Sequence, residues 1–430
     1  MNSTRSKVLV SAFSFAPRQS SEAGIGWATV ASLAKEYDVT VVVAGHYSDL
    51  FTLPDFEDLK NKGVTVEFHE VSRWLWLRKL PSFTHGPRLY YKLWQYHVYD
   101  RFRNIVERDQ SLFTHHVTWG AGTIYSRLVD LETPFIYGPV GGHETCPLGI
   151  SWRFSFFAWF NEVIRQTLIR RCQKSKSMRR LAENATLIFA ANTQTAEAFR
   201  AMGANNVKIV SNAGVYQERF ASEKDDVGQP IPDERIGPQL LFVGRLRSWK
   251  GEEIALHAIA KLKEIPWTLT IAGDGPNRKR CEQLCLKLGI ENRVTFMGST
   301  SSTQSLELFK NSDLFIFPSL HDSGGIVVLE AMANSLPVIC LNKGGPGDMV
   351  TQECGIAVTA GDWNQTVDAI AEASKRLLSD ATLRRRMGHA GRLRCASLYD
   401  WNQREVTMLE SIRVSLRLDV PSHDDQTPIQ

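Results

Sequence analysis

Residues 321–333 read His321-Asp322-Ser323-Gly324-Gly325-Ile326-Val327-Val328-Leu329-Glu330-Ala331-Met332-Ala333. This stretch follows the apolar run 314–317, which reads as a buried strand, and the pattern after the glycine pair is typical of a helix. Asp322 therefore belongs to a loop at the carboxyl end of a strand, and Glu330 lies about two turns into the helix that follows. Such a crevice is where open α/β sheets bind ligands. The stretch predicts an α/β fold with a binding site at this place.

The chemistry of the same stretch indicates the kind of ligand. The first N–H groups of a helix have no partner within the helix, so those near Gly324 and Gly325 favour an anion or hydroxyl groups. The carboxylates of Asp322 and Glu330 can accept hydrogen bonds from hydroxyls. Together these groups predict a ligand that carries both hydroxyls and phosphate.

Strand and helix patterns alternate along almost the whole chain, which predicts parallel α/β sheets. Strands are expected near 8–13, 39–43, 64–68, 112–117, 135–137, 187–190 and 207–210. A second series is expected at 240–243, 269–272, 294–296, 314–317, 338–340 and 356–358, with helices at 252–262, 278–288 and 326–333 between its strands. Each series suffices for a sheet of its own. We expect two doubly wound, Rossmann-like domains that face each other across a cleft.

The predicted domains are separated by a charged segment that contains prolines. Residues 1–221 form the N-terminal domain, residues 222–238 the linker, and residues 239–400 the C-terminal domain. Residues 401–430 hold a helix at 401–416 and a polar tail. This helix lies beyond the second sheet and can pack on either domain, including back on the N-terminal one.

Composition narrows the class of protein. The chain has 430 residues, of which 43% are hydrophobic and 22% charged, as in a soluble globular protein of two or three domains. A net charge of +4 is small for this length and does not point to nucleic acid. The seven cysteines contain no CxxC pair, so no zinc site or disulfide framework is indicated, and a cytoplasmic location is expected. The N-terminus lacks the pattern of a secretory signal, and no window approaches the roughly 20 apolar residues that span a bilayer.

Three glycine-containing turns of the second domain follow predicted strands. The first contains Arg245 and Lys250 between a strand and a helix, where a diphosphate would lie; the alternative is a solvated basic loop. The second is the turn 273–276, read as Gly-Asp-Gly-Pro. The third is the glycine loop 344–348, whose N–H groups are expected to be able to face an anion.

In this order and spacing, the segments resemble the retaining, nucleotide-sugar-dependent glycosyltransferases of family 4, which have the GT-B fold. The resemblance covers residues 240–358. The matching segments are Gly244-Arg245-Leu246…Lys250-Gly251, Gly273-Asp274-Gly275-Pro276, Phe296-Met297-Gly298, Asp313…Pro318-Ser319, Asp322 to Glu330, and Gly344-Gly345-Pro346. The family usually has two glutamates separated by seven residues where this chain has Asp322 and Glu330. The first acid is thus one methylene shorter here.

The resemblance implies a role for each matching residue. Arg245 and Lys250 would neutralise the donor diphosphate, and Glu330 would hydrogen-bond the ribose. Asp322 would hold the sugar hydroxyls together with the backbone of Ser323, Gly324 and Gly325, and Gly298 would belong to the donor site. Fixed cations stabilise the charge that develops on a departing diphosphate. Because the sequence has no DxD metal signature, we expect neither a metal nor another cofactor.

The first domain resembles the family more loosely. Gly24 and Gly26 follow the first strand, and the resemblance implies that a glycine loop here lines the cleft; the alternative is a tight turn with close packing, since Thr29 replaces the third glycine of a dinucleotide motif. The resemblance also implies a histidine near the donor sugar. His116 is the candidate and His115 the alternative, because neighbours on a strand face opposite ways. A core histidine is the competing interpretation. His143, in a further glycine loop, is a candidate contact for the acceptor.

Two stretches combine aromatic and basic residues. One contains Trp74 and Trp76 among arginines and lysines, and the other runs from Trp152 to Arg180. Rings beside cations are typical of an interfacial helix on an anionic membrane, and the alternative is that the rings are core residues. In the membrane interpretation, a lipid-linked sugar acceptor is expected.

These observations lead to one functional hypothesis and two alternatives. The hypothesis is retaining transfer of a sugar from a nucleotide-sugar donor to a hydroxyl of a saccharide or lipid-linked acceptor, in glycan or polysaccharide biosynthesis. One alternative is a nucleotide-sugar epimerase of the same fold, which would act on donor alone. The other is a non-catalytic protein that binds sugar nucleotides.

Overall fold

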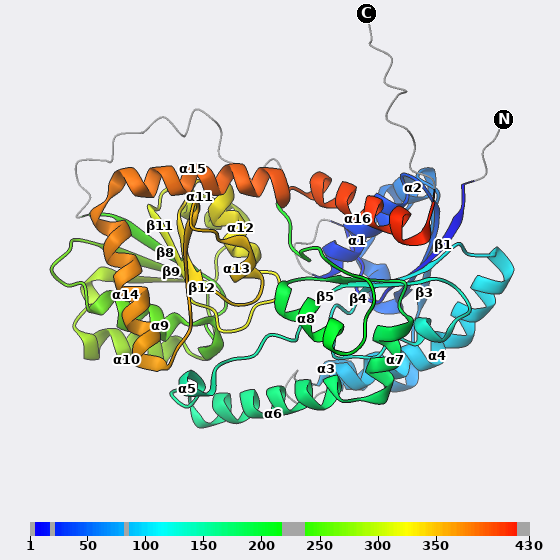
Figure 1. Cartoon of the computed structure of the whole chain (residues 1–430), viewed down its shortest axis with the longest axis horizontal. Helices are drawn as coiled ribbons and strands as arrows, with labels where there is room; N and C mark the ends of the chain where they lie inside the picture. The colour runs from blue at the N-terminus through cyan, green and yellow to red at the C-terminus, as the bar shows by residue number, and fades with distance from the viewer. Residues whose placement is uncertain (1–4, 18–21, 81–85, 217–236, 419–430) are drawn as a thin grey trace, which may run out of the picture.

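The computed structural model describes residues 5–17, 22–80, 86–216 and 237–418, and Figure 1 gives the whole chain. Most of the predicted linker, 222–238, lies outside these residues. Two parallel sheets form the framework, so the predicted pair of Rossmann-like domains is confirmed. The N-terminal sheet consists of β1 (Lys7–Ala12), β2 (Asp38–Ala44), β3 (Val64–His69), β4 (Thr114–Thr118), β5 (Phe135–Val140), β6 (Leu187–Ala190) and β7 (Val207–Ile209). The C-terminal sheet consists of β8 (Gln239–Val243), β9 (Thr268–Ala272), β10 (Val294–Gly298), β11 (Leu314–Phe317), β12 (Val338–Leu341) and β13 (Gly355–Val358).

The helices are given in two sets, those that come before β8 in the chain and those that come after it. The first set is α1 (Glu22–Leu33), α2 (Leu53–Asn61), α3 (Leu75–Lys79), α4 (Gly86–Asp109), α5 (Leu148–Ser151), α6 (Phe156–Gln173), α7 (Lys176–Asn184) and α8 (Thr193–Ala201). The second is α9 (Glu252–Ala260), α10 (Arg278–Leu288), α11 (Ser302–Lys310), α12 (Ile326–Ala333), α13 (Gly344–Met349), α14 (Trp363–Ser379), α15 (Ala381–Leu398) and α16 (Trp401–Leu416).

Strand order places a switch point in each sheet. The orders are β3-β2-β1-β4-β5-β6-β7 and β10-β9-β8-β11-β12-β13, so the winding reverses between β1 and β4 and again between β8 and β11. β8 and β11 are hydrogen-bonded neighbours, with Leu240 opposite Leu314. Loops that leave the carboxyl ends of such neighbours diverge and open a crevice. The loops to Lys250 and to Asp322 leave the β8/β11 pair.

Alternation along β1 shows how the N-terminal sheet is covered on both faces. Leu9 packs in the cluster of Tyr90 and Trp94 from α4, whereas Val8 and Val10 pack in the other cluster, with α1. Successive strand residues point to opposite faces, so a strand covered on both sides is apolar throughout. In the C-terminal domain one continuous core surrounds β8 to β13 and includes α9, α12 and α14.

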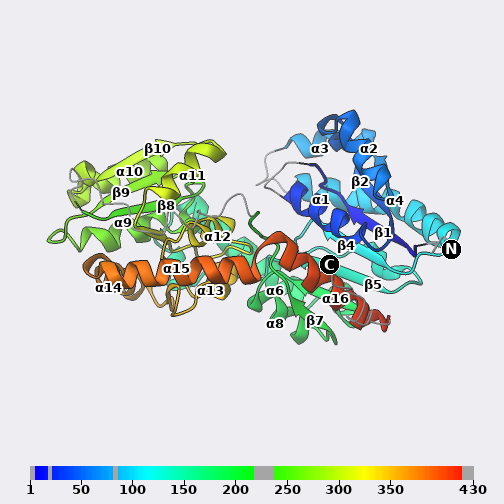
Figure 2. The same ribbon diagram turned by 90° about the horizontal axis from the view of Figure 1, so that it is seen from above.

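Helices α15 and α16 carry the chain from the C-terminal domain back to the N-terminal domain, along the upper edge of Figure 1 and across the molecule in Figure 2. Met408, Leu409 and Ile412 of α16 are buried in the N-terminal core that contains α1. Two polar contacts fasten the helix: Arg404 Nε donates to the Ser211 carbonyl at 2.6 Å, and Arg413 forms a bidentate pair with Glu36. Helix α16 thus completes the core of the first domain.

Helix α1 begins earlier than the sequence indicated. A glycine loop was expected at Gly24 and Gly26, but α1 begins at Glu22, so both glycines lie within a helix. A Cβ on Gly26 would approach the Ser14 carbonyl oxygen to 2.5 Å. Close packing of α1 against the segment after β1 therefore explains Gly26. This agrees with the close packing that the sequence offered as the alternative to a ligand-binding loop.

The packing of α16 yields a stability prediction. Replacing Ile412, which is fully buried, by alanine is expected to lower the free energy of unfolding by about 2–5 kcal/mol, because a cavity replaces the lost side chain. Val414 lies on the same helix and is 66% exposed. Val414→Ala should change the free energy by less than about 0.5 kcal/mol. Urea unfolding followed by tryptophan fluorescence measures both, and equal losses would contradict the packing of α16 on the N-terminal domain.

Candidate functional site

A cavity of about 620 Å³ lies between the two domains at the switch points. The N-terminal domain contributes the start of α1, and the C-terminal domain contributes the loops after β8 and β11. Its lining residues are Glu22, Gly24, Ile25, Trp27, Asn212, Ala213, Gly214, Val215, Tyr216, Val243, Gly244, Lys250, Phe317, Asp322, Gly324, Gly325, Ile326, Val327, Glu330 and Trp401. Three segments that are distant in sequence thus share one cavity: Gly24, Lys250, and the stretch from Asp322 to Glu330.

An ion pair joins the two loops of the C-terminal domain across the cavity wall. Lys250 Nζ lies 2.5 Å from Asp322 Oδ2, and the two side chains are only 23% and 17% exposed. The ammonium also lies over the Phe317 ring, 5.2 Å from its centroid. Burial weakens competition from water, so this pair is stronger than a surface ion pair. It places a cation and a carboxylate side by side at the start of α12.

Asp322 also organises the backbone around it. Its Oδ1 accepts a hydrogen bond from the Gly325 N–H at 3.1 Å, and its carbonyl accepts one from the Gly345 N–H at 2.9 Å. The prediction that the Gly325 N–H would be bare is therefore wrong. Gly325 has φ of +59°, and a Cβ there would come within 2.9 Å of Pro346, so glycine is required at this turn. Gly324 and Gly325 both line the cavity.

The third glycine loop is in fact a helix, α13, which packs against the loop that contains Asp322. Residues 344–349 form α13, and the Gly344 N–H donates to Gln194 Oε1 at 2.9 Å. With the Gly345 N–H bound to Asp322, these groups do not face an anion. Packing against the Asp322 loop, rather than ligand binding, accounts for the glycines.

A second cavity, of about 880 Å³, adjoins the first. The two share Val243, Gly244, Ile326, Val327 and Glu330. Arg245 and the turn 273–276 line the second cavity, whereas Lys250 lines the first. Glu330 borders both. The two predicted diphosphate cations thus line different cavities, which have five wall residues in common.

Gly298 and Ser323 are predicted site residues that line neither cavity within the described part of the chain. The Gly298 carbonyl accepts the Gly273 N–H at 2.7 Å, so it supports the turn beside Arg245. The Ser323 carbonyl accepts a hydrogen bond from Asn192 Nδ2 at 3.2 Å, which ties the donor-side loop to the N-terminal domain. Thr193 N–H adds a bond to Asp348 Oδ2 at 2.6 Å between the same domains.

His115 and His116 both belong to the core. His116 is 1% exposed and lies 3.4 Å from the Tyr91 hydroxyl oxygen, between the rings of Tyr91 and Tyr137. Burial lowers its pKa to about 4, so the ring is neutral at pH 7. His115 bonds the Gly138 carbonyl at 2.7 Å. Neither ring lines the cavities just described, and the core interpretation fits His116 better than a contact with a sugar.

His143 is likewise internal. Its Nε2 lies 3.0 Å from the Gly122 carbonyl oxygen, and its ring packs edge-on against Phe199. Burial lowers its pKa, although the bond to Gly122 opposes that shift. It therefore holds the loop after β5 in place and does not line the cleft.

Sequence reasoning did not single out Glu22 or Trp401. Glu22 lines the first cavity, and its carboxylate accepts the Gly120 N–H. Burial raises its pKa. An acid two residues before Gly24 was a usable signal for Glu22. Trp401 comes from α16, which reaches the cavity only through the return of the chain, so no local pattern reveals it.

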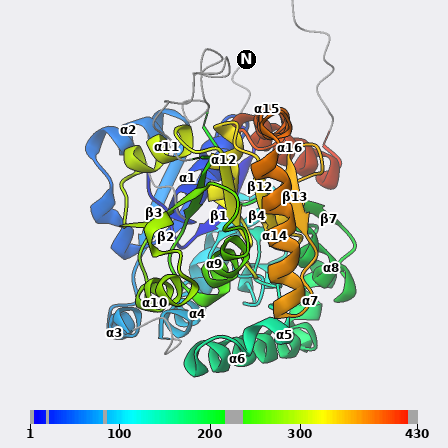
Figure 3. The same cartoon turned by 90° about the vertical axis from the view of Figure 1, so that its left-hand side faces the viewer.

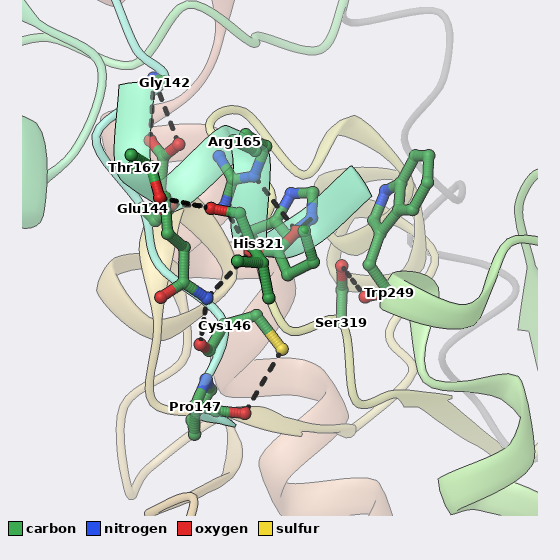
Figure 4. A network of polar contacts seen from close by, with 12 residues as sticks. Gly142, Glu144, Cys146, Pro147, Arg165, Thr167, Trp249, Ser319 and His321 are labelled. Carbon is green, nitrogen blue, oxygen red and sulfur yellow. Dashed lines mark hydrogen bonds and ion pairs between the residues drawn. The ribbon is translucent and has the colours of Figure 1, made fainter. Parts of the chain in front are cut away.

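A buried network behind the Lys250–Asp322 pair was also missed. His321 stacks on Trp249 with ring centroids 5.3 Å apart, and its Nε2 lies 3.1 Å from Glu162 Oε2 on α6. Arg165 Nε donates to the same Glu162 oxygen at 3.1 Å. Figure 4 shows Arg165, His321 and Trp249 lying next to one another.

Neighbouring polar and charged groups keep the buried Glu162 carboxyl ionised. Burial alone would raise its pKa, but the contacts with His321 and Arg165 outweigh burial and lower the pKa to about 2. His321 and Trp249 directly precede Asp322 and Lys250 in the chain. Helix α6 of the first domain therefore contacts His321 through Glu162, and His321 packs on Trp249. These contacts help to position Asp322 and Lys250, the residues that follow His321 and Trp249 in the chain.

Metal and membrane features complete the description. Among the residues that the structure places, no group of three or more His, Cys, Asp or Glu side chains is arranged to hold a metal ion. No helix within those ranges is both long and apolar enough to cross a bilayer.

Comparisons with known proteins identify the C-terminal half. A family model described as "Glycosyl transferases group 1" matches residues 223–394. An uncharacterized glycosyltransferase of Methanocaldococcus jannaschii is 34% identical over 205 residues, which cover 46% of this chain and 51% of the relative. A glycogen synthase of Mycobacterium tuberculosis is 33% identical over 171 residues, or 39% of this chain and 40% of the relative. This chain thus spans about half or less of the length of these curated relatives.

Solved structures match over nearly the whole chain. HepE of Anabaena, in complex with UDP, aligns with a TM-score of 0.61 and 17% identity over 95% of this chain and 100% of that chain. A sucrose-phosphate synthase from Thermosynechococcus elongatus aligns with a TM-score of 0.63 and 18% identity over 96% and 100%. The chain therefore has the GT-B fold, and its C-terminal half carries a glycosyl transferases group 1 domain.

Proposed function

We propose that this protein is a retaining glycosyltransferase of family 4 that moves a sugar from a nucleotide-sugar donor to a hydroxyl of a saccharide or lipid-linked acceptor, in glycan or polysaccharide biosynthesis. The observation that carries the proposal is the Lys250–Asp322 ion pair in the first cavity. Glu330 lines both this cavity and the second one. A cation, a carboxylate and glycine backbone at one switch point suit a ligand with phosphates and hydroxyls.

The donor would extend through both cavities. Its diphosphate would lie near the shared wall, between Lys250 in the first cavity and Arg245 in the second. Glu330 would accept hydrogen bonds from the ribose, and the sugar would lie in the first cavity beside Asp322 and Gly324. HepE, whose solved structure holds UDP, has the same fold, and this likeness supports a nucleotide-sugar donor.

Donor binding would exchange the partners of Lys250. The ammonium leaves the Asp322 carboxylate for phosphate oxygens, and the freed Oδ2 accepts a sugar hydroxyl. As the bond between the sugar and the diphosphate breaks, its electron pair stays on the diphosphate, where the fixed cations stabilise the charge. The acceptor oxygen forms the new bond to the sugar, and its proton passes to the departing diphosphate.

The acceptor would enter along the N-terminal wall of the cavity. Glu22 and Trp27 lie there, with Tyr216 and Trp401 at the same cavity. A buried carboxyl and aromatic rings suit hydroxyls and the apolar faces of a saccharide.

We also propose a cytoplasmic location for the protein. All seven cysteines are free thiols, which is what a reducing compartment favours.

The role of Lys250 is testable with one substitution. Lys250→Gln should lower kcat/KM with the donor by on the order of a hundredfold, because a preorganised charge aimed at the diphosphate is lost. Isothermal titration with a panel of nucleoside diphosphates and steady-state kinetics measure the effect. Lys287→Gln is the matched control, because Lys287 is exposed on α10 and outside both cavities. Unchanged diphosphate affinity in the Lys250 variant would overturn the assignment.

The second prediction is that turnover does not require a divalent metal ion, because fixed cations take its place at the diphosphate. We expect turnover of the wild-type protein to be the same in EDTA as in excess Mg²⁺, since Lys250 and Arg245 neutralise the diphosphate. The measurement is the initial rate of nucleoside diphosphate release after extensive dialysis against chelator. A rate that falls with EDTA and returns with a divalent ion would contradict the expectation.

The stereochemical course is a third prediction. The product should keep the anomeric configuration of the donor, and NMR coupling constants of the isolated product report that configuration. Incubation of donor without acceptor should yield at most slow hydrolysis. Conversion of donor to a second nucleotide sugar would instead favour an epimerase, and an inverted product would exclude the retaining mechanism.

A further inference from the structure

Helix α6 exposes a patch of aromatic rings that nothing in the donor site uses. Phe156 is 68% exposed, Phe157 77% and Phe160 49%, and Trp152 just before them is 59% exposed. Phe157 is more exposed than any other large hydrophobic side chain in the described part of the chain. The rings also contact one another: Phe156 stacks on Phe160 with centroids 6.2 Å apart and lies 5.8 Å from Phe157. An exposed, contiguous apolar patch of this kind marks a surface that binds something.

Cations continue the same face of the helix. Arg170 and Arg171 lie in the last turn of α6, Lys174 is the C-cap residue of the helix, and all three are exposed. Phe156, Phe160, Arg171 and Lys174 recur at intervals that bring them to one side of a helix. The acid of α6, Glu162, is on the buried side and pairs with His321. The free face therefore has rings in its first half, cations in its second half, and no carboxylate.

The place of α6 in the molecule fits contact with an extended plane. The helix has 18 residues, so it is about 27 Å long. It runs along the lower edge of the molecule in Figure 1, and α5 and α6 again form the lower edge in Figure 3. Its opposite side, with Glu162, Gln166, Ile169 and Cys172, is buried against the protein. The exposed side can thus lie flat on a surface without any rearrangement.

We propose that the exposed face of α6 docks on an anionic phospholipid bilayer. The rings would enter the boundary between head groups and acyl chains, and the three cations would contact lipid phosphates. The separation of rings from cations along one helix, with no exposed acid, matches a surface that is apolar beneath a layer of negative charge. This inference does not depend on the reaction that the protein catalyses.

Vesicle flotation tests the inference with the full-length protein. The wild type should float with vesicles of phosphatidylcholine mixed with phosphatidylglycerol, should remain behind with phosphatidylcholine alone, and should detach as salt is raised. Phe156→Ser combined with Phe157→Ser should weaken binding by about tenfold or more. Arg170→Gln, Arg171→Gln and Lys174→Gln together should weaken it by on the order of a hundredfold, at about fivefold for each cation.

Matched controls separate the surface from general effects. Leu286→Ser removes an exposed apolar side chain from α10, and Arg385→Gln with Arg386→Gln removes two exposed cations from α15. Both controls should bind vesicles as the wild type does. All replaced side chains are exposed, so each variant should keep the wild-type Tm.

Two outcomes would overturn the proposal. One is vesicle binding that is equal in the wild type and the α6 variants. The other is a wild type that ignores anionic vesicles but forms a dimer in sedimentation equilibrium that Phe156→Ser with Phe157→Ser dissociates, since the rings would then bind a second copy of the chain. Either result leaves the proposed transferase activity to be judged by its own kinetics.

Discussion

The site depends on the buried pair of Lys250 and Asp322. Two side chains that are mostly withdrawn from water would destabilise the fold as isolated charges, so each is held by further contacts. Asp322 accepts the Gly325 N–H with one oxygen and Lys250 with the other, and its carbonyl accepts the Gly345 N–H. The starts of α12 and α13 therefore meet at one residue. This arrangement also brings the loops after β8 and β11 together, which forms the wall of the cavity.

The same contacts give a physical reason for the aspartate at a position where the resembling family usually has glutamate. An aspartate side chain can bond an N–H group a few residues further along its own backbone, as in turns and helix caps. Asp322 does so at Gly325 while it still reaches Lys250. A glutamate would carry its carboxylate one methylene further from the backbone. The shorter acid thus favours a compact, preorganised loop, and it leaves more of the cavity open beside Gly324.

Most of the framework could be predicted from the sequence, because strongly apolar strands and capped helices are local features. The bounds expected at 278–288, 326–333 and 401–416 coincide with α10, α12 and α16. Lys250, Asp322, Gly324, Gly325 and Glu330 share a cavity because parallel strands send their loops to the same edge. The remaining features depend on contacts between distant segments. Gly26 reflects the approach of the Ser14 carbonyl and Gly344 that of the Asp322 carbonyl. Glu162 lies far along the chain from its partner His321.

Helix α6 links the two surfaces of the protein that bear on function. Its exposed side carries Phe156 and Phe157, and its buried side carries Glu162, which holds His321 beside the Asp322 loop. A bilayer would alter donor affinity through this helix only if it bound one position of α6 more tightly than another. In that case the coupling is reciprocal: lipid would change donor affinity by the same factor by which donor changes lipid affinity. If α6 instead keeps the same position with and without bound lipid, it only anchors the protein to the membrane. It would then hold the cleft at a fixed height above the membrane and leave donor affinity unchanged.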